Sequence, residues 1–152
     1  MHLIAVGRLR AGPEFDLFTR YADRLRPRLA VTEVGEAAGD PVSAKRSEGA
    51  ALLAALPRDS LAVALDLGGP AVTSEAFARQ LEAWQASDRK PAFLIGGADG
   101  LSAAVLQRAD YVLSLGSLTW PHMLVRVLLA EQLYRAQCIA GGHPYHRAGR
   151  PA

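Results

Sequence analysis

The sequence predicts an α/β fold, a mainly parallel sheet with helices on both faces. Four short apolar runs predict buried strands, and the segments between them carry the three- and four-residue spacing of amphipathic helices. Strands that alternate with helices of about 10 to 15 residues indicate parallel pairing, because each helix returns the chain to the same end of the sheet. The four runs are His2–Gly7, Leu61–Leu65, Ala92–Ile95 and Tyr111–Leu115.

The amino-terminal half adds a fifth strand and two helices. Apolar residues recur at helical spacing through 13–26, and Leu29–Val34 alternates apolar and polar residues, as expected of a strand with one exposed face. Gly35–Ser43 has no periodicity and contains two glycines and a proline, which predicts a mobile surface loop. Ser43 is expected to cap the next helix, and Pro57 to end it.

Three further helices are predicted in the carboxyl-terminal half. Ser74 is expected to cap the first, the second covers Ser102–Ala109, and the long third helix follows Pro121 and reaches Ile139. Apolar side chains cover most of the circumference of this last helix, so it must be buried on nearly all sides. The sheet can cover one side, and a second copy of the protein is a natural cover for the other. The sequence therefore predicts a homodimer.

Length and composition predict one globular domain, residues 1–152, with a sizeable core. Apolar residues make up 50% of the chain and charged residues 21%. No apolar run approaches the roughly 20 residues of a membrane span, and the amino terminus lacks the basic region and cleavage site of a signal peptide. Cys138 is the single cysteine, so an internal disulfide is excluded. We expect a cytoplasmic protein.

Basic residues gather toward both ends of the sequence. Residues 1–30 contain six Arg and three acidic residues, and residues 101–152 contain five Arg and two acidic residues. If the two segments meet in space, they form an Arg-rich face suited to a polyanion such as RNA. Solvated helix faces explain the same distribution equally well.

Three loops that follow strands are predicted to build one pocket. They begin at Asp66, Gly96 and Gly116, and ligands of parallel sheets bind at the carboxyl ends of the strands. Glycines let the main chain approach a ligand closely, and backbone donors and acceptors in an apolar slot can read an adenine. A nucleotide-like ligand is one interpretation, and ordinary strand-to-helix turns are the other.

Three motifs, in this order and spacing, resemble the RlmH family. They are Leu94–Gly100 (LIGGADG), Leu113–Arg126 (LSLGSLTWPHMLVR) and His143–Arg147 (HPYHR); the resemblance also includes Lys45–Gly49 and covers essentially the whole chain. The family consists of SPOUT-class methyltransferases acting on N3 of a pseudouridine in the 23S ribosomal RNA of the bacterial large subunit. The resemblance implies S-adenosylmethionine, a homodimer and a trefoil knot in the carboxyl-terminal part of the SPOUT fold.

The resemblance places the methyl donor against the turns of the predicted pocket. Asp66 and Asp99 offer countercharges to its sulfonium, although acids in such turns are more often caps. One departure from the family is Gly116, where a small residue such as serine is common. The residues implied to bind the donor are Leu65, Gly96, Leu115, Gly116, Ser117, Leu118, Thr119 and Trp120.

The catalytic candidates on the last helix are His122 and Arg126. The imide nitrogen N3 must lose its proton before it attacks, so a base or an anion-stabilising cation is needed. The two residues lie one turn apart and share a helix face. We hypothesise that His122 orients the base or relays its proton, and that Arg126 holds a substrate phosphate or the donor's carboxylate. The alternative is a helix cap at His122 and an ion pair at Arg126.

The tail supplies four more candidates. His143, Tyr145, His146 and Arg147 suit stacking on a base and binding of phosphate. Packing of the tail on the core or on a partner subunit is the alternative. No metal site is predicted at His143 and His146, because no further cysteine or nearby acid completes one.

The sequence favours a methyltransferase that binds 23S ribosomal RNA in the large subunit or the assembled ribosome. Two other functions stay open. Gly96–Gly100 is a candidate phosphate loop of a nucleotide-binding α/β enzyme, but its spacing lacks the dinucleotide fingerprint. The second is a dimeric RNA- or ribosome-binding protein without catalysis, against which the presence of His122, Arg126 and the full tail argues.

Overall fold

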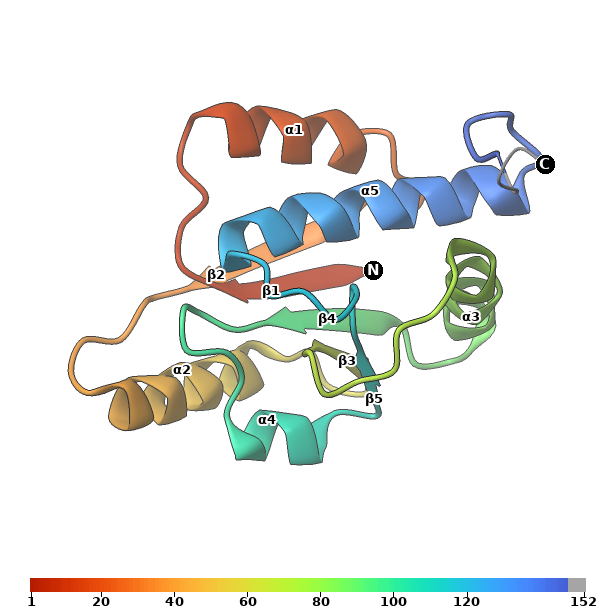
Figure 1. Cartoon of the computed structure of the whole chain (residues 1–152). Helices are drawn as coiled ribbons and strands as arrows, with labels where there is room; N and C mark the ends of the chain where they lie inside the picture. Colours follow the sequence, from red (N-terminus) through yellow and green to blue (C-terminus); the bar gives the residue numbers. More distant parts are fainter. Residues whose placement is uncertain (148–152) are drawn as a thin grey trace.

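A five-stranded parallel sheet lies between two layers of helices (Figure 1) in the computed structural model, which describes residues 1–147. All four strand pairings are parallel, as predicted. The carboxyl ends of the strands therefore meet along one edge of the sheet. The strands are β1 (His2–Val6), β2 (Ala30–Val34), β3 (Leu61–Leu65), β4 (Pro91–Ile95) and β5 (Tyr111–Leu113), in the order β2-β1-β4-β3-β5.

Helices cover both faces of the sheet and give the protein two cores. One face carries α1 (Pro13–Ala22), α3 (Ser74–Ala86) and α5 (His122–Ala140), and the other carries α2 (Pro41–Ala55) and α4 (Ala103–Arg108) (Figure 1). Within β1, Leu3 and Ala5 join the first core, whereas Ile4 and Val6 join the second. Both faces of a central strand are thus buried, which explains why these strands are continuous apolar runs.

Two helices begin at residues other than those predicted. Asp40 caps α2, because its Oδ1 accepts a hydrogen bond of 3.0 Å from the N–H of Ser43, which already lies in the first turn. Pro41 suits the first helical position and favours this start, so the loop after β2 is shorter than expected. Thr73 caps α3 through its Oγ1, 3.1 Å from the nitrogen of Ala76, and Ser74 is the first helical residue.

The long helix α5 lies over the sheet between α1 and α3. Leu129 and Leu133 are fully buried, whereas Leu124 and Leu128 are only half-buried. The flanking helices α1 and α3 therefore bury part of the apolar surface of α5 that we expected the sheet and a second copy of the protein to bury. Strand order does not test the implied trefoil knot, which stays a prediction. Within residues 1–147, no helix has the length and apolar character needed to cross a membrane.

Candidate functional site

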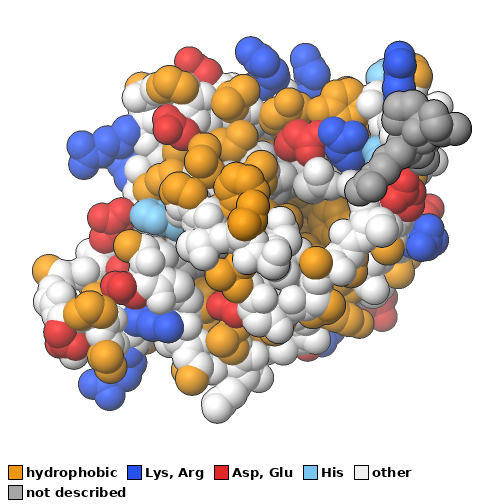
Figure 2. All heavy atoms as spheres, viewed as in Figure 1, with side chains coloured by type: hydrophobic (Ala, Val, Ile, Leu, Met, Phe, Trp, Pro, Cys, Tyr) orange, Lys and Arg blue, Asp and Glu red, His pale blue; other side chains and the backbone are white. Residues whose placement is uncertain are grey.

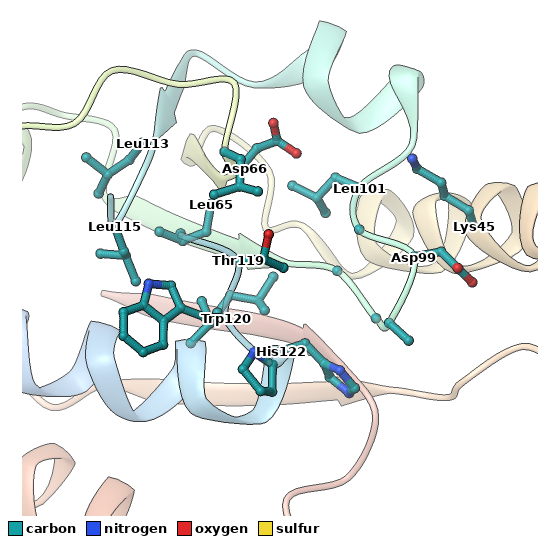
Figure 3. Close-up of a pocket in the computed structure, with 18 residues that line it drawn as sticks. Lys45, Leu65, Asp66, Asp99, Leu101, Leu113, Leu115, Thr119, Trp120 and His122 are labelled. Carbon is teal, nitrogen blue, oxygen red and sulfur yellow. The ribbon is translucent and has the colours of Figure 1, made fainter. Parts of the chain in front are cut away.

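A cavity of about 730 Å³ opens at the carboxyl ends of β3, β4 and β5 (Figure 3). Small-molecule sites usually have volumes of roughly 300 to 1,000 Å³. The loops that follow these three strands and the first turn of α5 form its walls. Five of the predicted donor-binding residues line it: Leu65, Gly96, Leu115, Thr119 and Trp120.

The ends of three adjacent strands give the cavity an apolar floor. Leu65, Ile95 and Leu113 close β3, β4 and β5, and all three are buried. Leu115 and Trp120 continue the apolar wall at one end of the cavity (Figure 3). This end offers the surface that a flat, weakly polar ring requires.

Charged side chains stand elsewhere on the rim. Lys45 of α2 and Asp99 lie at the end of the cavity opposite Trp120 (Figure 3). Asp66 also lines the cavity, and its Oδ1 accepts a hydrogen bond of 2.8 Å from the N–H of Gly68, so this carboxylate holds its own turn. Lys45 was not among the predicted site residues. The available signal was its position in Lys45–Gly49, a segment that resembles the family.

The loop after β4 is too tight to accept side chains at its glycines. A Cβ atom on Gly96 would lie 2.5 Å from the carbonyl oxygen of Gly100, and one on Gly97 would lie 2.8 Å from Oε2 of Glu48. Gly100 has a φ of +80°, and its N–H donates to the carbonyl of Gly97 at 3.0 Å. Glycine at positions 96 and 97 therefore lets this loop, Gly96–Gly100 (the glycine loop), pack closely on itself and on Glu48 while it lines the cavity.

The turn between β5 and α5 is held by Ser114. Its Oγ donates to the carbonyl oxygen of Gly116 at 2.7 Å and lies 3.2 Å from the nitrogen of the same residue, which has a φ of +115°. The predicted donor-binding residues of this turn divide into three groups. Leu115, Thr119 and Trp120 line the cavity, Gly116 borders a neighbouring cavity of about 270 Å³, and Ser117 and Leu118 border neither.

His122 lines the cavity from the first turn of α5. Its side chain is 23% exposed, and its Nε2 is buried without a hydrogen-bond partner among residues 1–147. The nearest acidic group is the carboxylate of Glu36, whose Oε1 lies 3.8 Å from Nε2, beyond hydrogen-bonding distance. The Nε2 is therefore unpaired but enclosed by protein atoms beside Glu36, and the ring must turn before this nitrogen can reach a bound molecule.

Arg126 does not line the cavity, although it shares a helix face with His122. Only 1% of its side chain is exposed. Its Nη1 donates to Oε2 of Glu33 at 2.7 Å, and its Nη2 donates to the carbonyls of Val6 at 2.6 Å and Gly7 at 2.5 Å. The guanidinium is therefore bound to the ends of β1 and β2, as in the ion-pair alternative, and does not face a ligand.

The tail is attached to α5 and α3 of its own chain. The Tyr145 hydroxyl donates to Oε1 of Glu131 at 2.9 Å, and Nε2 of His146 lies 2.8 Å from Oε1 of Glu75. Burial, followed by hydrogen bonding to Tyr21 and Glu131, raises the pKa of Tyr145 above its ordinary value. The hydrogen bond from His146 lowers the pKa of Glu75. These contacts give the tail a defined place.

Within one chain, the tail and the cavity lie at opposite ends of α5 (Figure 1). The helix has 19 residues, which corresponds to about 28 Å. His143 and Arg147 are exposed at the tail end. One chain thus brings His122 to the cavity but leaves all four tail candidates remote from it.

Similarity to known proteins covers the whole described chain. Residues 1–146 match a family model described as predicted SPOUT methyltransferase. A relative from Gluconacetobacter diazotrophicus, named ribosomal RNA large subunit methyltransferase H, is 63% identical over 152 residues, which is 100% of both chains. A relative of the same name from Acidiphilium cryptum is 55% identical over 151 residues, 99% of this chain and 96% of that one.

A solved structure supports the fold independently. The structure of a probable methylase family protein from Haemophilus influenzae Rd KW20 matches with a TM-score of 0.58 at 14% identity, over 99% of this chain and 71% of that one. At this identity the likeness concerns the fold alone. The family match and the two relatives carry the assignment further, and they agree with the three motifs. The chain belongs to the RlmH family of SPOUT methyltransferases.

Proposed function

We propose that this protein methylates N3 of a pseudouridine in the 23S ribosomal RNA of the large subunit. S-adenosylmethionine is the methyl donor, and the protein acts as a homodimer in the cytoplasm. The observation that carries the proposal is the cavity at the ends of β3, β4 and β5, whose walls are the turns that hold the family's motifs. The two relatives at 63% and 55% identity, both named for methylation of large-subunit ribosomal RNA, support the substrate.

The residues of the cavity fit the chemistry of the donor. The apolar end with Leu115 and Trp120 suits an adenine, and the glycine loop offers main-chain hydrogen bonds for the more polar parts of the donor. Lys45 and Asp99 carry opposite charges, which suit the carboxylate and amino groups of the methionine part. The donor supplies a methyl group on a sulfonium that is already a good leaving group. The protein's main contribution is then alignment of the acceptor nitrogen with that methyl.

His122 is the residue that we assign to the acceptor's proton. The imide N3–H must be deprotonated for attack, and a positioned imidazole is suited to this exchange near neutral pH. Its Nε2 has no competing hydrogen bond within the described chain, and its ring lines the cavity. His122 therefore holds the N3–H in line and accepts its proton as the nitrogen attacks.

A second subunit accounts for both the apolar surface and the remote tail. Leu118 is 69% exposed and Trp120 39% exposed, and Figure 2 shows hydrophobic side chains gathered over α1 and the first half of α5. Contiguous apolar patches of this kind mark interaction sites. Antiparallel pairing of two α5 helices about a twofold axis brings each tail to the cavity of the other subunit. His143, Tyr145, His146 and Arg147 then contact the RNA there.

The direct test uses donor labelled in its methyl group. Free 23S RNA, isolated large subunits and assembled ribosomes are each incubated with the protein, and the labelled base is mapped. We expect label on one pseudouridine, in subunits or ribosomes. Absence of label in all three substrates, with normal donor binding, would favour the RNA-binding protein without catalysis.

Calorimetry separates the remaining alternative. S-adenosylmethionine, NAD and ATP are titrated into the protein, and only the first is expected to bind. Binding of NAD or ATP with no affinity for the methyl donor would assign the cavity to a nucleotide-binding enzyme and overturn the proposal.

A further inference from the structure

We propose that Glu33 and Arg126 form a positioning pair that sets the first turn of α5, and with it His122, against the cavity. The inference rests on the proposed function, because it assigns these two residues a part in the same reaction. In this role Arg126 contacts neither the donor nor the RNA. It acts through the helix that carries His122.

The pair joins segments that are distant in the sequence. Arg126 is the largest fully buried side chain of the described protein. Its guanidinium binds Glu33 and the carbonyls of Val6 and Gly7. Glu33 in turn holds the loop after β1, because its Oε2 accepts a hydrogen bond of 2.5 Å from the N–H of Leu9. One guanidinium thereby connects α5 with β1, and through Glu33 with β2 and that loop.

These contacts lie directly behind the cavity. In the sheet, Ala5 of β1 pairs with Ile95 of β4, and the glycine loop follows Ile95. A Cβ atom on Gly97 would lie 3.1 Å from Cγ1 of Val6, so the end of β1 supports that loop. The end of β1 therefore lies between the glycine loop and the start of α5, and Arg126 binds it from the side of α5.

The start of α5 has no side-chain anchor of its own. Its cap residue, Pro121, provides no side-chain hydrogen bond, and no acidic residue lies in the first turn. Arg126 is one turn beyond His122 on the same face, and the adjacent Val125 lines the cavity. The rotation and height of this turn are consequently determined by the guanidinium and the groups that it bridges.

The Glu33–Arg126 pair contributes more to the placement of α5 than to the net stability of the fold. A buried ion pair recovers little more than the desolvation cost of its two charges, but removal of one partner leaves an uncompensated buried charge. Here the Nε of Arg126 has no partner within residues 1–147, so the site is not optimised for the number of its hydrogen bonds. What the arrangement does provide is geometry, because a planar fork binds a carboxylate and two carbonyls in fixed directions.

A second acidic residue offers a matched control. Asp110 accepts a hydrogen bond of 2.8 Å from the N–H of Ala62 and pairs with Arg89 at 2.6 Å. Glu33 likewise combines one backbone N–H with an arginine, and Asp110 has a second arginine, Arg108, at 3.3 Å. Asp110 lies at the opposite edge of the sheet, before β5, and does not touch the cavity. Asp110→Asn therefore removes a comparable ion pair and backbone contact at a position that cannot alter the placement of His122.

The experiment compares Glu33→Gln with Asp110→Asn. Turnover on large subunits, donor affinity by calorimetry and thermal unfolding are measured, and the ring signals of His122 are followed by NMR. We expect Glu33→Gln to lower kcat at least about tenfold at a temperature where it is folded, with donor Kd and RNA KM within about threefold, because misplacement acts on alignment. The His122 signals should shift. Asp110→Asn should keep kcat within about twofold of wild type despite lower thermal stability.

Further variants keep the test decisive. Arg126→Lys retains the charge but cannot bridge three acceptors, and is expected to reduce kcat by a similar factor. If Glu33→Gln does not fold, Glu33→Asp carries the same expectation. Unchanged kcat and unshifted His122 signals would overturn the positioning role. Failure of the wild-type protein to bind the donor would instead overturn the proposed function, and the NMR comparison, which needs no donor, would still test the placement of His122.

Discussion

The two ends of α5 each carry an arginine paired with a glutamate, but the pairs differ in kind. Arg126 is 1% exposed and binds Glu33, 93 residues away on another element. Arg135 is 26% exposed and binds Glu131 within the same helix, at 2.5 Å. The first pair joins α5 to the sheet. The second lies at the surface, where an ion pair contributes little to stability, and its two side chains contact Tyr145 and His146 of the tail.

This difference divides the proposed site into a fixed half, which is the cavity with His122, and a movable half, which is the tail from His143 to Arg147. At the cavity end, polar groups are bound to strands and cannot shift without the sheet. At the tail end, Tyr145 and His146 are attached only by side-chain contacts, which we expect to adjust more easily than contacts to strands if the tail binds RNA as proposed. Because about 28 Å of helix lies between the halves, the proposed function brings them together through a second subunit.

The largest expected effect comes from removal of the movable half. Deletion from Gly142 onward should reduce RNA methylation at least about 100-fold, because acceptor alignment is lost. Donor affinity should stay within about threefold, since the cavity residues precede the deletion. Methyl transfer to large subunits and calorimetry measure the two quantities. Unchanged turnover would show that the tail has no part in the reaction.

A mixture of two inactive variants tests whether the halves come from different subunits. Dimers are formed from His122→Ala chains with intact tails and tail-deleted chains with intact His122. Half of the dimers are then mixed, and each has one complete site if the tail serves the partner, so about a quarter of wild-type activity should return. No recovery would place the tail and the cavity of one chain in the same site. Each variant refolded alone is the control.

A smaller loss of turnover is expected when His122, the proposed proton acceptor in the fixed half, is replaced. His122→Ala should lower kcat about 100-fold, the scale of a single general base, with donor affinity nearly unchanged. His143→Ala is a useful comparison, since it removes an exposed imidazole from the tail. A kcat of His122→Ala equal to that of the wild type would exclude His122 as the base.

The next largest effect is expected from a change in the cavity wall that is proposed to bind the donor. Gly96→Ala should weaken donor binding about tenfold, because its Cβ would lie 2.5 Å from the carbonyl oxygen of Gly100 and displace the loop. Gly35→Ala is the matched control, because nothing lies within 4 Å of a Cβ at that position. Calorimetric titration of the donor compares the two. Equal affinities would mean that the glycine loop does not touch the donor.

The sequence predicted best what depends on periodicity and on burial from both sides. The central strands and α5 were located correctly because their apolar patterns reflect the cores that they enter. Helix starts were less certain where neighbouring residues both can cap, as at Thr73 and Ser74. In each such case local chemistry permits two answers, and tertiary packing decides between them.

The role of Arg126 shows why the site was only partly predictable. Helical spacing correctly placed it on the face of His122, and a shared function seemed to follow. The sequence does not reveal that the carbonyls of Val6 and Gly7 and the carboxylate of Glu33 meet this guanidinium. Such partners arise from the order of strands in the sheet, with β1 placed between β2 and β4. Contacts between residues so far apart in the sequence are fixed by the topology of the sheet, which hydrophobic periodicity does not encode.

The smallest effect should come from loosening the movable half without removing it. The hydrogen bond from His146 lowers the pKa of Glu75, so this contact stabilises the tail above the ordinary glutamate pKa of roughly 4.3 and is lost as the pH falls through the lowered value. At neutral pH, Glu75→Gln should therefore mimic the acid state. We expect kcat to fall no more than about threefold, because Tyr145 still binds Glu131 at 2.9 Å.

Limited proteolysis of the tail between pH 7 and pH 3 measures this contact directly. In the wild type, cleavage after Tyr145 should accelerate toward the acid end of the range, whereas Glu75→Gln should be cleaved at the faster rate throughout. Glu82→Gln, on the same helix α3, should behave as the wild type, because the structure pairs the tail with Glu75. A tail released equally in all three proteins would mean that its position depends on Tyr145, the packing of its ring and the contact of His146 with Arg135, and not on Glu75.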